Sequence, residues 1–247
     1  MLKNLDSALY PLTITVFEKR PHPTYAWATD DVKVTLILYS PMVLIDRYFT
    51  DKRMANIQNK LNHLLDMNNV YKEWQSYFKA PSYLPHIDKY LNIHTSSVYY
   101  DKYGVMDLKK ELSLNSKILP VDQILYRGGS SSEFPPGWED GQAIEWDRPR
   151  STTLNIQTAM IHAGKDCASN TLYGEHDPKL IPILLVLKIA NSLVKGYVFA
   201  YGNRNLMRHE KEVLLSPCIK LVKTKEKNYD DVGVKVIFAN VYGSIET

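Results

Sequence analysis

Hydrophobic and polar residues alternate along much of the first forty positions of the chain. The segments LTITVFEK (12–19) and VKVTLILYS (32–40) carry apolar side chains at alternate positions, and a loop containing two prolines joins them. Because successive side chains of a strand point to opposite faces, this pattern predicts two strands. We therefore expect residues 1–45 to form a separate β-like segment, whose role the pattern does not reveal.

The apolar positions change to helical spacing from Asp51 to about Lys79. This spacing predicts one long amphipathic helix or two shorter ones. The segment APSYLPH interrupts the pattern, and two further helical stretches are predicted at 86–92 and 106–114. Residues 46–118 thus read as a helical lead-in to the rest of the chain.

Short apolar runs bounded by turn-forming residues dominate after Pro120, which is typical of strands. A helix is expected at 155–164, and the Gly/Ser/Pro-rich stretch 128–141 is expected to be a loop. The pattern indicates an α+β fold in which N-terminal helices precede mainly antiparallel strands, with residues 46–247 as one domain and 119–247 as its β-rich core. The predicted strands are 123–128, 150–155, 181–190, 196–201, 212–217, 218–225 and 234–242.

Composition narrows the class of protein. Of 247 residues, 45% are hydrophobic and 23% are charged, as in ordinary globular domains. The net charge of +3 is scattered, which gives little support for a nucleic-acid partner. The two cysteines favour a reducing compartment over a disulfide framework, and the longest apolar run (180–190) is too short to span a bilayer. With no secretory signal pattern at the N-terminus, we expect a soluble protein made in a cytoplasm, with no membrane partner.

Three polar features fall at the ends of predicted strands. Arg127 ends the strand in LYRGG, residues 151–153 (Ser-Thr-Thr) open the next, and Glu210 and Glu212 precede VLL. Residues i and i+2 of an extended chain point to the same side, roughly 6.5 Å apart, so the two glutamates are predicted to share one face. For an isolated Glu-x-Glu the ordinary interpretation is a charged strand end that blocks edge pairing.

The order Arg, Ser-Thr-Thr and Glu-x-Glu resembles the Arg-Ser-Glu signature of mono-ADP-ribosyltransferases, a family that includes bacterial toxins, phage enzymes and vertebrate ecto-enzymes. The family's middle motif is usually Ser-Thr-Ser, and here Thr153 stands in the third position. The resemblance covers residues 120–243 and implies a split β-sandwich, in which two sheets face each other and NAD binds in the cleft.

The resemblance also implies a role for each residue. Glu212 would stabilise the oxocarbenium-like ribosyl cation as nicotinamide departs, and Ser151 would orient that carboxylate. Arg127 would bind the pyrophosphate or the neighbouring ribose through its planar fork, and no metal is required. The residues expected to bind NAD are Arg127, Gly128, Ser151, Thr152, Thr153 and Glu212.

Glu-x-Glu in this family accompanies arginine acceptors. Because a guanidinium has a pKa above about 12, it needs a neighbouring base to become nucleophilic, and Glu210 is expected to supply it. The implied function is transfer of ADP-ribose from NAD to an arginine of a target protein, by a toxin or a phage-encoded host modifier that acts in a host cytoplasm or is secreted by a non-standard route. Two alternatives stay open: an NAD glycohydrolase, and a catalytically silent binding module.

Three other signals have less specific explanations. The segment GEHD (174–177) could bind a metal but is interpreted as a polar loop, since no matching ligand pair stands at metal spacing. The segment 201–209 reads as a turn, and the resemblance implies that it meets the acceptor protein. His162 is interpreted as a packed or surface histidine. One of the seventeen tyrosines could stack on nicotinamide, and the sequence does not say which.

Overall fold

The computed structural model describes residues 2–25, 27–54, 57–78, 84–91, 96–166, 171–172, 180–198 and 210–244. Its helices are α1 (Leu5–Leu9), α2 (Pro41–Thr50), α3 (Gln58–Met67), α4 (Asn69–Tyr77), α5 (Pro85–Leu91), α6 (Ser96–Tyr103), α7 (Met106–Asn115) and α8 (Ile156–His162). Its strands are β1 (Leu12–Pro21), β2 (Thr29–Leu38), β3 (Lys117–Ile118), β4 (Ile124–Ser130), β5 (Ala143–Trp146), β6 (Arg150–Thr153), β7 (Lys165–Asp166), β8 (Thr171–Leu172), β9 (Pro182–Ile189), β10 (Lys195–Val198), β11 (Glu212–Leu215), β12 (Ile219–Tyr229) and β13 (Val234–Gly243).

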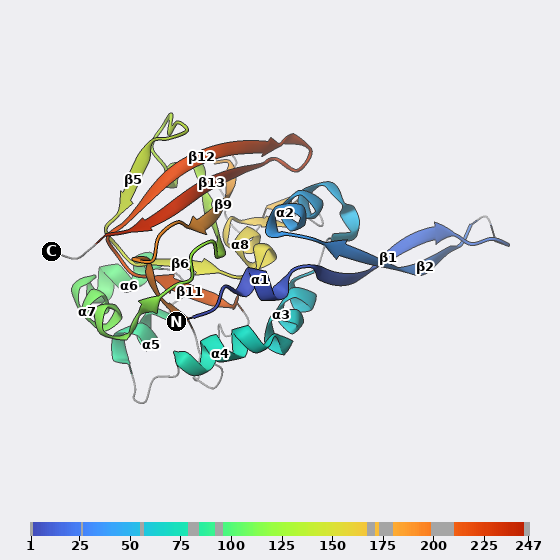
Figure 1. Cartoon of the computed structure of the whole chain (residues 1–247). Helices are drawn as coiled ribbons and strands as arrows, with labels where there is room; N and C mark the ends of the chain where they lie inside the picture. The colour runs from blue at the N-terminus through green and yellow to red at the C-terminus, as the bar shows by residue number, and fades with distance from the viewer. Residues whose placement is uncertain are drawn as a thin grey trace.

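A nine-stranded sheet forms the body of the molecule, in the order β3-β10-β11-β6-β4-β9-β13-β12-β5 (Figure 1). Its strand pairs are antiparallel except for β9 and β13, which run parallel. β4 and β6 share a single residue pair, Tyr126 with Thr153. The two strands are therefore paired over a very short stretch at this junction. The junction joins a four-stranded half that ends at β6 to a five-stranded half that begins at β4.

Strand β9 lies between two hydrophobic cores. Its Leu185 and Leu187 belong to a core shared with α4, α5 and α7, whereas Leu184 and Val186 belong to a core shared with α2, α8 and the root of the β1–β2 hairpin. Since successive strand residues face opposite sides, a strand buried on both faces must be apolar throughout. This explains the uninterrupted run PILLVL at the centre of the sheet.

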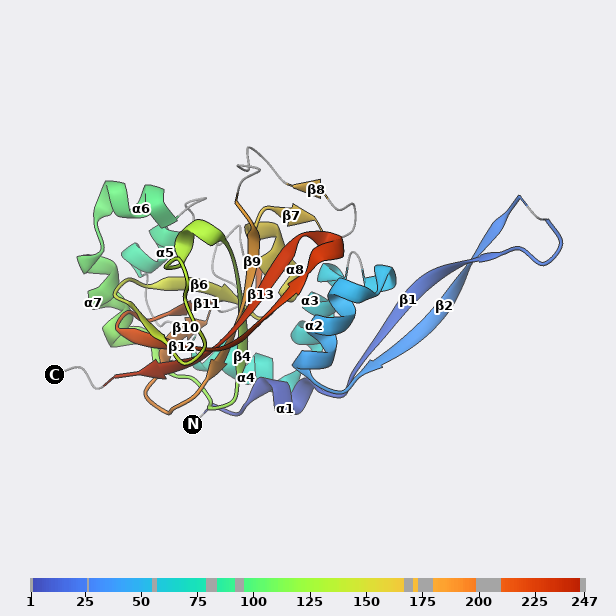
Figure 2. The ribbon, with the colours of Figure 1, turned by 90° about the horizontal axis from the view of Figure 1, so that it is seen from above.

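The β1–β2 hairpin pairs ten residues of each strand and projects from the body in two perpendicular views (Figures 1 and 2). Only its root is buried, through side chains such as Ile14 and Leu38, which pack in the second core with α2. The expected boundary between residues 45 and 46 falls inside α2, so the division of the chain at that point stays a prediction.

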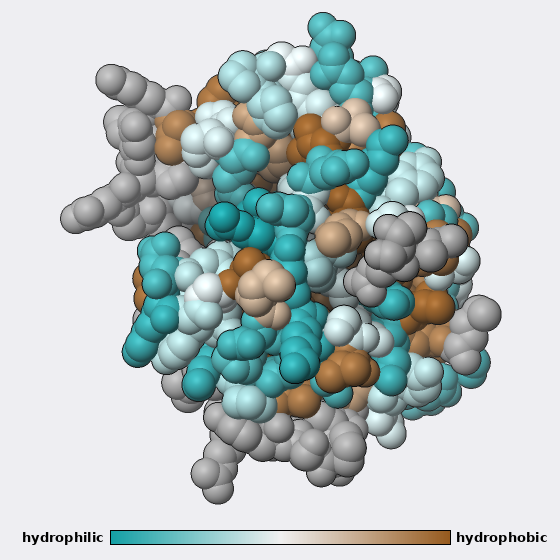
Figure 3. Space-filling model, turned by 90° about the vertical axis from the view of Figure 1, so that its left-hand side faces the viewer, coloured by the Kyte–Doolittle hydropathy of each residue, from teal (hydrophilic) through white to brown (hydrophobic). Residues whose placement is uncertain are grey.

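The α+β prediction and the mainly antiparallel strands are confirmed. Helices α1, α2 and α6 were not predicted, and within the described residues the strand expected at 196–201 covers only 195–198. None of the helices in the described ranges is long and apolar enough to cross a membrane. The face carrying α6, α7 and β5 displays hydrophobic atoms in small patches among hydrophilic ones (Figure 3), as ordinary protein surface does.

Candidate active site at the sheet junction

Strands β6 and β11 place Ser151 and Glu212 on the same face of the sheet. In their antiparallel pairing Glu212 lies opposite Thr153, and Leu214 lies opposite Ser151. Directly opposed side chains share a face, so Ser151 and Glu212 are diagonal neighbours on it. The Ser151 hydroxyl forms a hydrogen bond with the Glu212 carboxylate. The structure thus brings together two of the residues that the signature singled out.

The hydroxyls of the two threonines in the motif form hydrogen bonds with backbone groups. Thr152 Oγ1 donates a hydrogen bond to the Val213 carbonyl oxygen at 2.6 Å. Thr153 Oγ1 donates to the Glu210 carbonyl oxygen and accepts from the backbone N–H of Asn155 at 3.0 Å. Both side chains are buried. They fix the backbone on either side of Glu212, and their expected contact with NAD stays a prediction.

Glu212 is an ionisable group enclosed by protein, with 7% of the residue exposed. The pKa of its carboxyl is raised to about 7, mainly by burial. The Ser151 hydrogen bond and the positive charges of His162 and Arg127 lower this pKa, and the negative charge of Glu210 raises it. These groups come from β6, α8, β4 and the residues just before β11. The carboxyl is therefore poised to change its charge near neutral pH, as groups at catalytic sites often are.

Arg127 extends from β4 across the junction to β6. Its Nη1 donates to the Ser151 carbonyl oxygen at 2.9 Å, and its Nη2 lies 2.8 Å from Glu133 Oε2. Its guanidinium also lies over the Trp146 ring, 5.9 Å from the centroid. Arg127 therefore binds the backbone of Ser151 and lies near Glu212. Its other terminal nitrogen pairs with the carboxylate of Glu133.

Two more arginines lie beside Arg127. Arg150 packs over the Trp146 ring at 5.3 Å, and Arg148 lies over the Tyr100 ring at 5.6 Å. Within the described part of the chain, the buried Arg150 Nε has no hydrogen-bond partner. Burial and the charge of Arg127 both lower the pKa of Arg150. Positive charge is therefore concentrated here, and a buried N–H donor is left without a partner.

The two glycines after Arg127 have different roles. A Cβ on Gly128 would lie 1.7 Å from the Ala159 carbonyl oxygen and 2.5 Å from the Ala163 nitrogen. Gly128 is therefore required by the close approach of α8 to β4, and its expected contact with NAD stays a prediction. A Cβ on Gly129 would lie 2.4 Å from Glu133 Oε1, so the glycine leaves space for the Glu133 side chain.

The two glutamates do not share a strand face in the way that the extended-chain geometry predicted. Strand β11 begins at Glu212, and Lys211 adopts a left-handed backbone with φ of 52°. The Lys211 side chain is buried, and its Nζ lies 2.6 Å from Asp66 Oδ1 of α3. Glu210 nevertheless lies close enough to raise the pKa of Glu212. The pair is brought together by a turn rather than by strand alternation.

His162, at the end of α8, is a site residue that the sequence did not reveal. Its Nε2 lies 3.2 Å from Glu210 Oε2, and this hydrogen bond is the main cause of a raised His162 pKa. Nothing in the spacing of the motifs indicates this contact, because it depends on how closely α8 packs against Gly128 of β4.

Two tyrosines from the helical lead-in lie near the same charges. The Tyr90 hydroxyl donates to Tyr100, and the Tyr100 hydroxyl donates to the Pro149 carbonyl oxygen at 2.8 Å. Tyr90 is buried, and burial, Tyr100 and the charge of Glu212 all raise its pKa, whereas Arg127 lowers it. Helices α5 and α6 therefore contribute an aromatic side to the site.

Some predicted features lie outside the described residues, namely 174–177, 201–209 and Cys167. Among the side chains that are described, no group of three or more His, Cys, Asp or Glu is arranged to hold a metal ion.

No protein-family model matches this sequence, and a search of curated proteins finds no match. Several solved structures resemble the chain in part. Vis, an ADP-ribosyltransferase from Vibrio splendidus, is 15% identical with a TM-score of 0.46, over 83% of this chain and 91% of that one. C3stau2 from S. aureus, solved with NAD, is 13% identical with a TM-score of 0.42, over 81% and 92%. Plx2a, an ADP-ribosyltransferase toxin from Paenibacillus larvae, is 15% identical with a TM-score of 0.43, over 77% and 98%. At TM-scores below 0.5 these likenesses assign neither a family nor an activity.

Proposed function

We propose that this protein is a mono-ADP-ribosyltransferase that uses NAD as its substrate and modifies an arginine of another protein. What supports this is the convergence of Arg127, Ser151, Glu210 and Glu212 at one junction of the sheet, although they come from three separate segments. Each residue type there suits one part of the reaction.

The arginine cluster suits the pyrophosphate of NAD. Arg127, Arg148 and Arg150 bring three positive charges to the site, where Glu133 pairs with Arg127, and the pyrophosphate carries two negative charges. Glu133 Oε2, which accepts from Arg127 Nη2, occupies a position that a phosphate oxygen could also take. The partnerless N–H of Arg150 offers a further donor. NAD therefore fits the residues present.

Glu212 suits the sugar end of the substrate. Bound NAD supplies a nicotinamide group that leaves from a ring already positively charged, so the protein need not protonate it. An ionised Glu212 beside the ribose stabilises the positive charge that develops there as the glycosidic bond breaks. The Ser151 hydrogen bond keeps more of Glu212 ionised, because it lowers the pKa that burial raises. Burial makes the stabilisation stronger than it would be in water.

Glu210 suits the acceptor. One of its oxygens pairs with the His162 ring at 3.2 Å and is therefore placed to accept a hydrogen bond from an N–H donor. An arginine side chain entering from solvent would take the place of the half-exposed His162. As a guanidinium nitrogen forms its bond to the ribose carbon and nicotinamide leaves, Glu210 accepts the guanidinium proton.

The test is incubation of the purified protein with NAD and agmatine, a small guanidinium compound, followed by mass spectrometry. We expect free nicotinamide and an agmatine–ADP-ribose adduct from the native protein and from Glu145→Gln, an exposed control. We expect neither product from Glu212→Gln. Nicotinamide without adduct would identify an NAD glycohydrolase instead, and intact NAD would identify a silent binding module.

A further inference from the structure

The outer part of the β1–β2 hairpin, residues 17–33, is an arm that stands away from the body (Figures 1 and 2). Its strands pair in register from Phe17 with Lys33 to Pro21 with Thr29, and its side chains are mostly exposed. An isolated two-stranded hairpin is at best marginally stable in water. The arm therefore adds little to folding, and another use should account for it.

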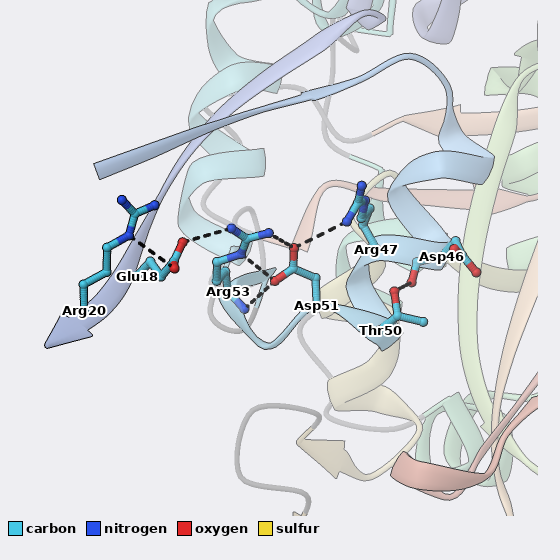
Figure 4. Close-up of polar contacts among 7 residues, drawn as sticks. All are labelled: Glu18, Arg20, Asp46, Arg47, Thr50, Asp51 and Arg53. Carbon is cyan, nitrogen blue, oxygen red and sulfur yellow. Dashed lines mark hydrogen bonds and ion pairs between the residues drawn. The ribbon is translucent and has the colours of Figure 1, made fainter. Parts of the chain in front are cut away.

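An ion-pair network fixes the arm to the body at its root (Figure 4). Arg53 Nη1 lies 3.2 Å from Glu18 Oε2, and the same guanidinium holds Asp51 through Nε at 2.8 Å and Nη2 at 2.7 Å. Arg20 pairs with the other Glu18 oxygen at 3.4 Å. The arm thus leaves the body in a defined direction.

The tip of the arm is a preorganised aromatic cluster. The His22 and Tyr25 rings lie 4.9 Å apart, and the Tyr25 and Trp27 rings 5.6 Å apart. His22 Nδ1 accepts hydrogen bonds from the backbone N–H of Thr24 and of Tyr25, at 3.0 and 3.1 Å. Trp27 is 85% exposed and Tyr25 52%. Trp and Tyr dominate binding hot spots, and a preformed cluster binds at a lower entropic cost.

Helix α3 connects the arm to the acceptor glutamate. Lys60 of α3 lies over the Phe17 ring at 5.8 Å, and Asp66 of α3 pairs with Lys211, which stands between Glu210 and Glu212. Six residues of helix span about 9 Å. The arm itself reaches roughly 13 Å beyond its root, at about 3.3 Å per residue from Phe17 to Pro21. A protein is large enough to contact both the tip and Glu210.

Two other occupants fit the arm less well. Charged side chains and Pro21 on its strands oppose edge pairing with a second copy of the chain. Its cations also balance its anions, so an anionic membrane would not attract it. The cations are Lys19, Arg20 and Lys33, and the anions are Glu18, Asp30 and Asp31.

Given the proposed function, we propose that the arm recruits the acceptor protein. The Tyr25–Trp27 tip would bind an apolar pocket on the folded acceptor and hold one of its arginines near Glu210. The arm would then determine which proteins are modified, without taking part in the chemistry.

The experiment compares two variants of the arm with a control. Tyr25→Ser/Trp27→Ser removes the aromatic tip, and a shortened variant replaces residues 19–31 with Asn-Gly, a favourable hairpin turn, while it keeps the Glu18–Arg53 ion pair. The control is Leu114→Ser, at an apolar residue of α7 that is 72% exposed. Each protein is assayed with agmatine and with the proteins of a cell lysate, using labelled NAD. We expect all three to modify agmatine within about twofold of the native rate, and both arm variants to label lysate proteins at least about tenfold less.

Four outcomes would overturn the recruiting role. Native labelling of lysate proteins by both arm variants would show that the arm does not select acceptors. Loss of agmatine modification in the arm variants alone would show that the arm shapes the catalytic site. If light scattering shows that the native protein is a dimer and the shortened variant a monomer, the arm binds a second copy of the chain. Sedimentation with phosphatidylcholine–phosphatidylserine vesicles that depends on Trp27 would show that the arm binds a membrane. Failure of the proposed function itself is distinct, because the native protein would then form no agmatine–ADP-ribose adduct.

Discussion

Glu212→Gln should stabilise the folded protein at alkaline pH while it abolishes NAD cleavage. The Glu212 carboxyl has a pKa of about 7 in the folded protein against an ordinary value of 4.5, and burial is the main cause. Above pH 7 the native fold must therefore hold a buried negative charge. The difference between the two values corresponds to about 3 kcal/mol of unfolding free energy. Glutamine has the same shape and carries no charge, so it avoids this cost.

The effect should depend on pH in a defined direction. Between pH 4.5 and about 7 the folded state binds the Glu212 proton more tightly than the unfolded state does. The contribution of Glu212 to the unfolding free energy consequently falls as pH rises through this window and is constant above it. The glutamine variant lacks this contribution. Its unfolding free energy should exceed that of the native protein by nearly zero at pH 4.5 and by about 3 kcal/mol at pH 8. The difference at pH 8 corresponds to roughly 6–12 °C in Tm for a chain of this size.

Urea and thermal denaturation of the native protein, Glu212→Gln and the exposed control Glu145→Gln at pH 5 and pH 8 would measure this effect. Glu145→Gln should change the unfolding free energy little at either pH, because its side chain is solvated. An equal effect of Glu212→Gln at both pH values, or a loss of stability at pH 8, would refute the claim that Glu212 is buried as a charge.

Three further changes test other parts of the site. Ser151→Ala removes the hydrogen bond that lowers the Glu212 pKa, so the acid limb of the pH–rate profile for nicotinamide release should move to higher pH; an unmoved limb would make Ser151 merely structural. Arg127→Lys should weaken NAD binding in calorimetry, since a point charge cannot replace a bidentate fork, and unchanged affinity with an intact fold would contradict the assignment. Gly128→Ala should destabilise the fold by several kcal/mol, roughly 3 or more, because its Cβ would collide with the α8 backbone, whereas Gly129→Ala should displace only the Glu133 side chain; equal melting temperatures of the two variants would contradict this distinction.

Much of the fold could be predicted because local patterns and tertiary structure agree. The alternation at 12–19 and 32–40 corresponds to β1 and β2, and the apolar run at 181–190 corresponds to β9, buried on both faces. Asn155 caps α8 by accepting the backbone N–H of Gln157, as its position after the Ser-Thr-Thr strand suggests.

Helix α2 was missed although its signals are present. Ser40 caps it, Pro41 begins it, and its buried residues Leu44, Ile45, Tyr48 and Phe49 recur at helical spacing. Because the loop between the hairpin and this helix is short, residues 41–45 were assigned to the β segment, and the expected boundary fell inside the helix.

The details of the site could not be predicted, because they depend on contacts between distant segments. The left-handed turn at Lys211 is held by Asp66, which is 145 residues away, and that turn displaces Glu210 from the strand. The His162–Glu210 pair requires the close packing of α8 on Gly128. Sequence order indicated which residues converge, and tertiary packing determined how they face one another.

The division of labour between the two glutamates is tested most directly by measuring nicotinamide release with and without agmatine in Glu210→Gln and Glu212→Gln. We predict that Glu212→Gln loses both activities, because the ribosyl charge develops whichever acceptor attacks. Glu210→Gln should lose modification of agmatine and keep much of the NAD hydrolysis, because water has no guanidinium proton to lose. Equal loss of both activities in the two variants would contradict separate roles, and full activity in both would show that these carboxylates do not form the active site.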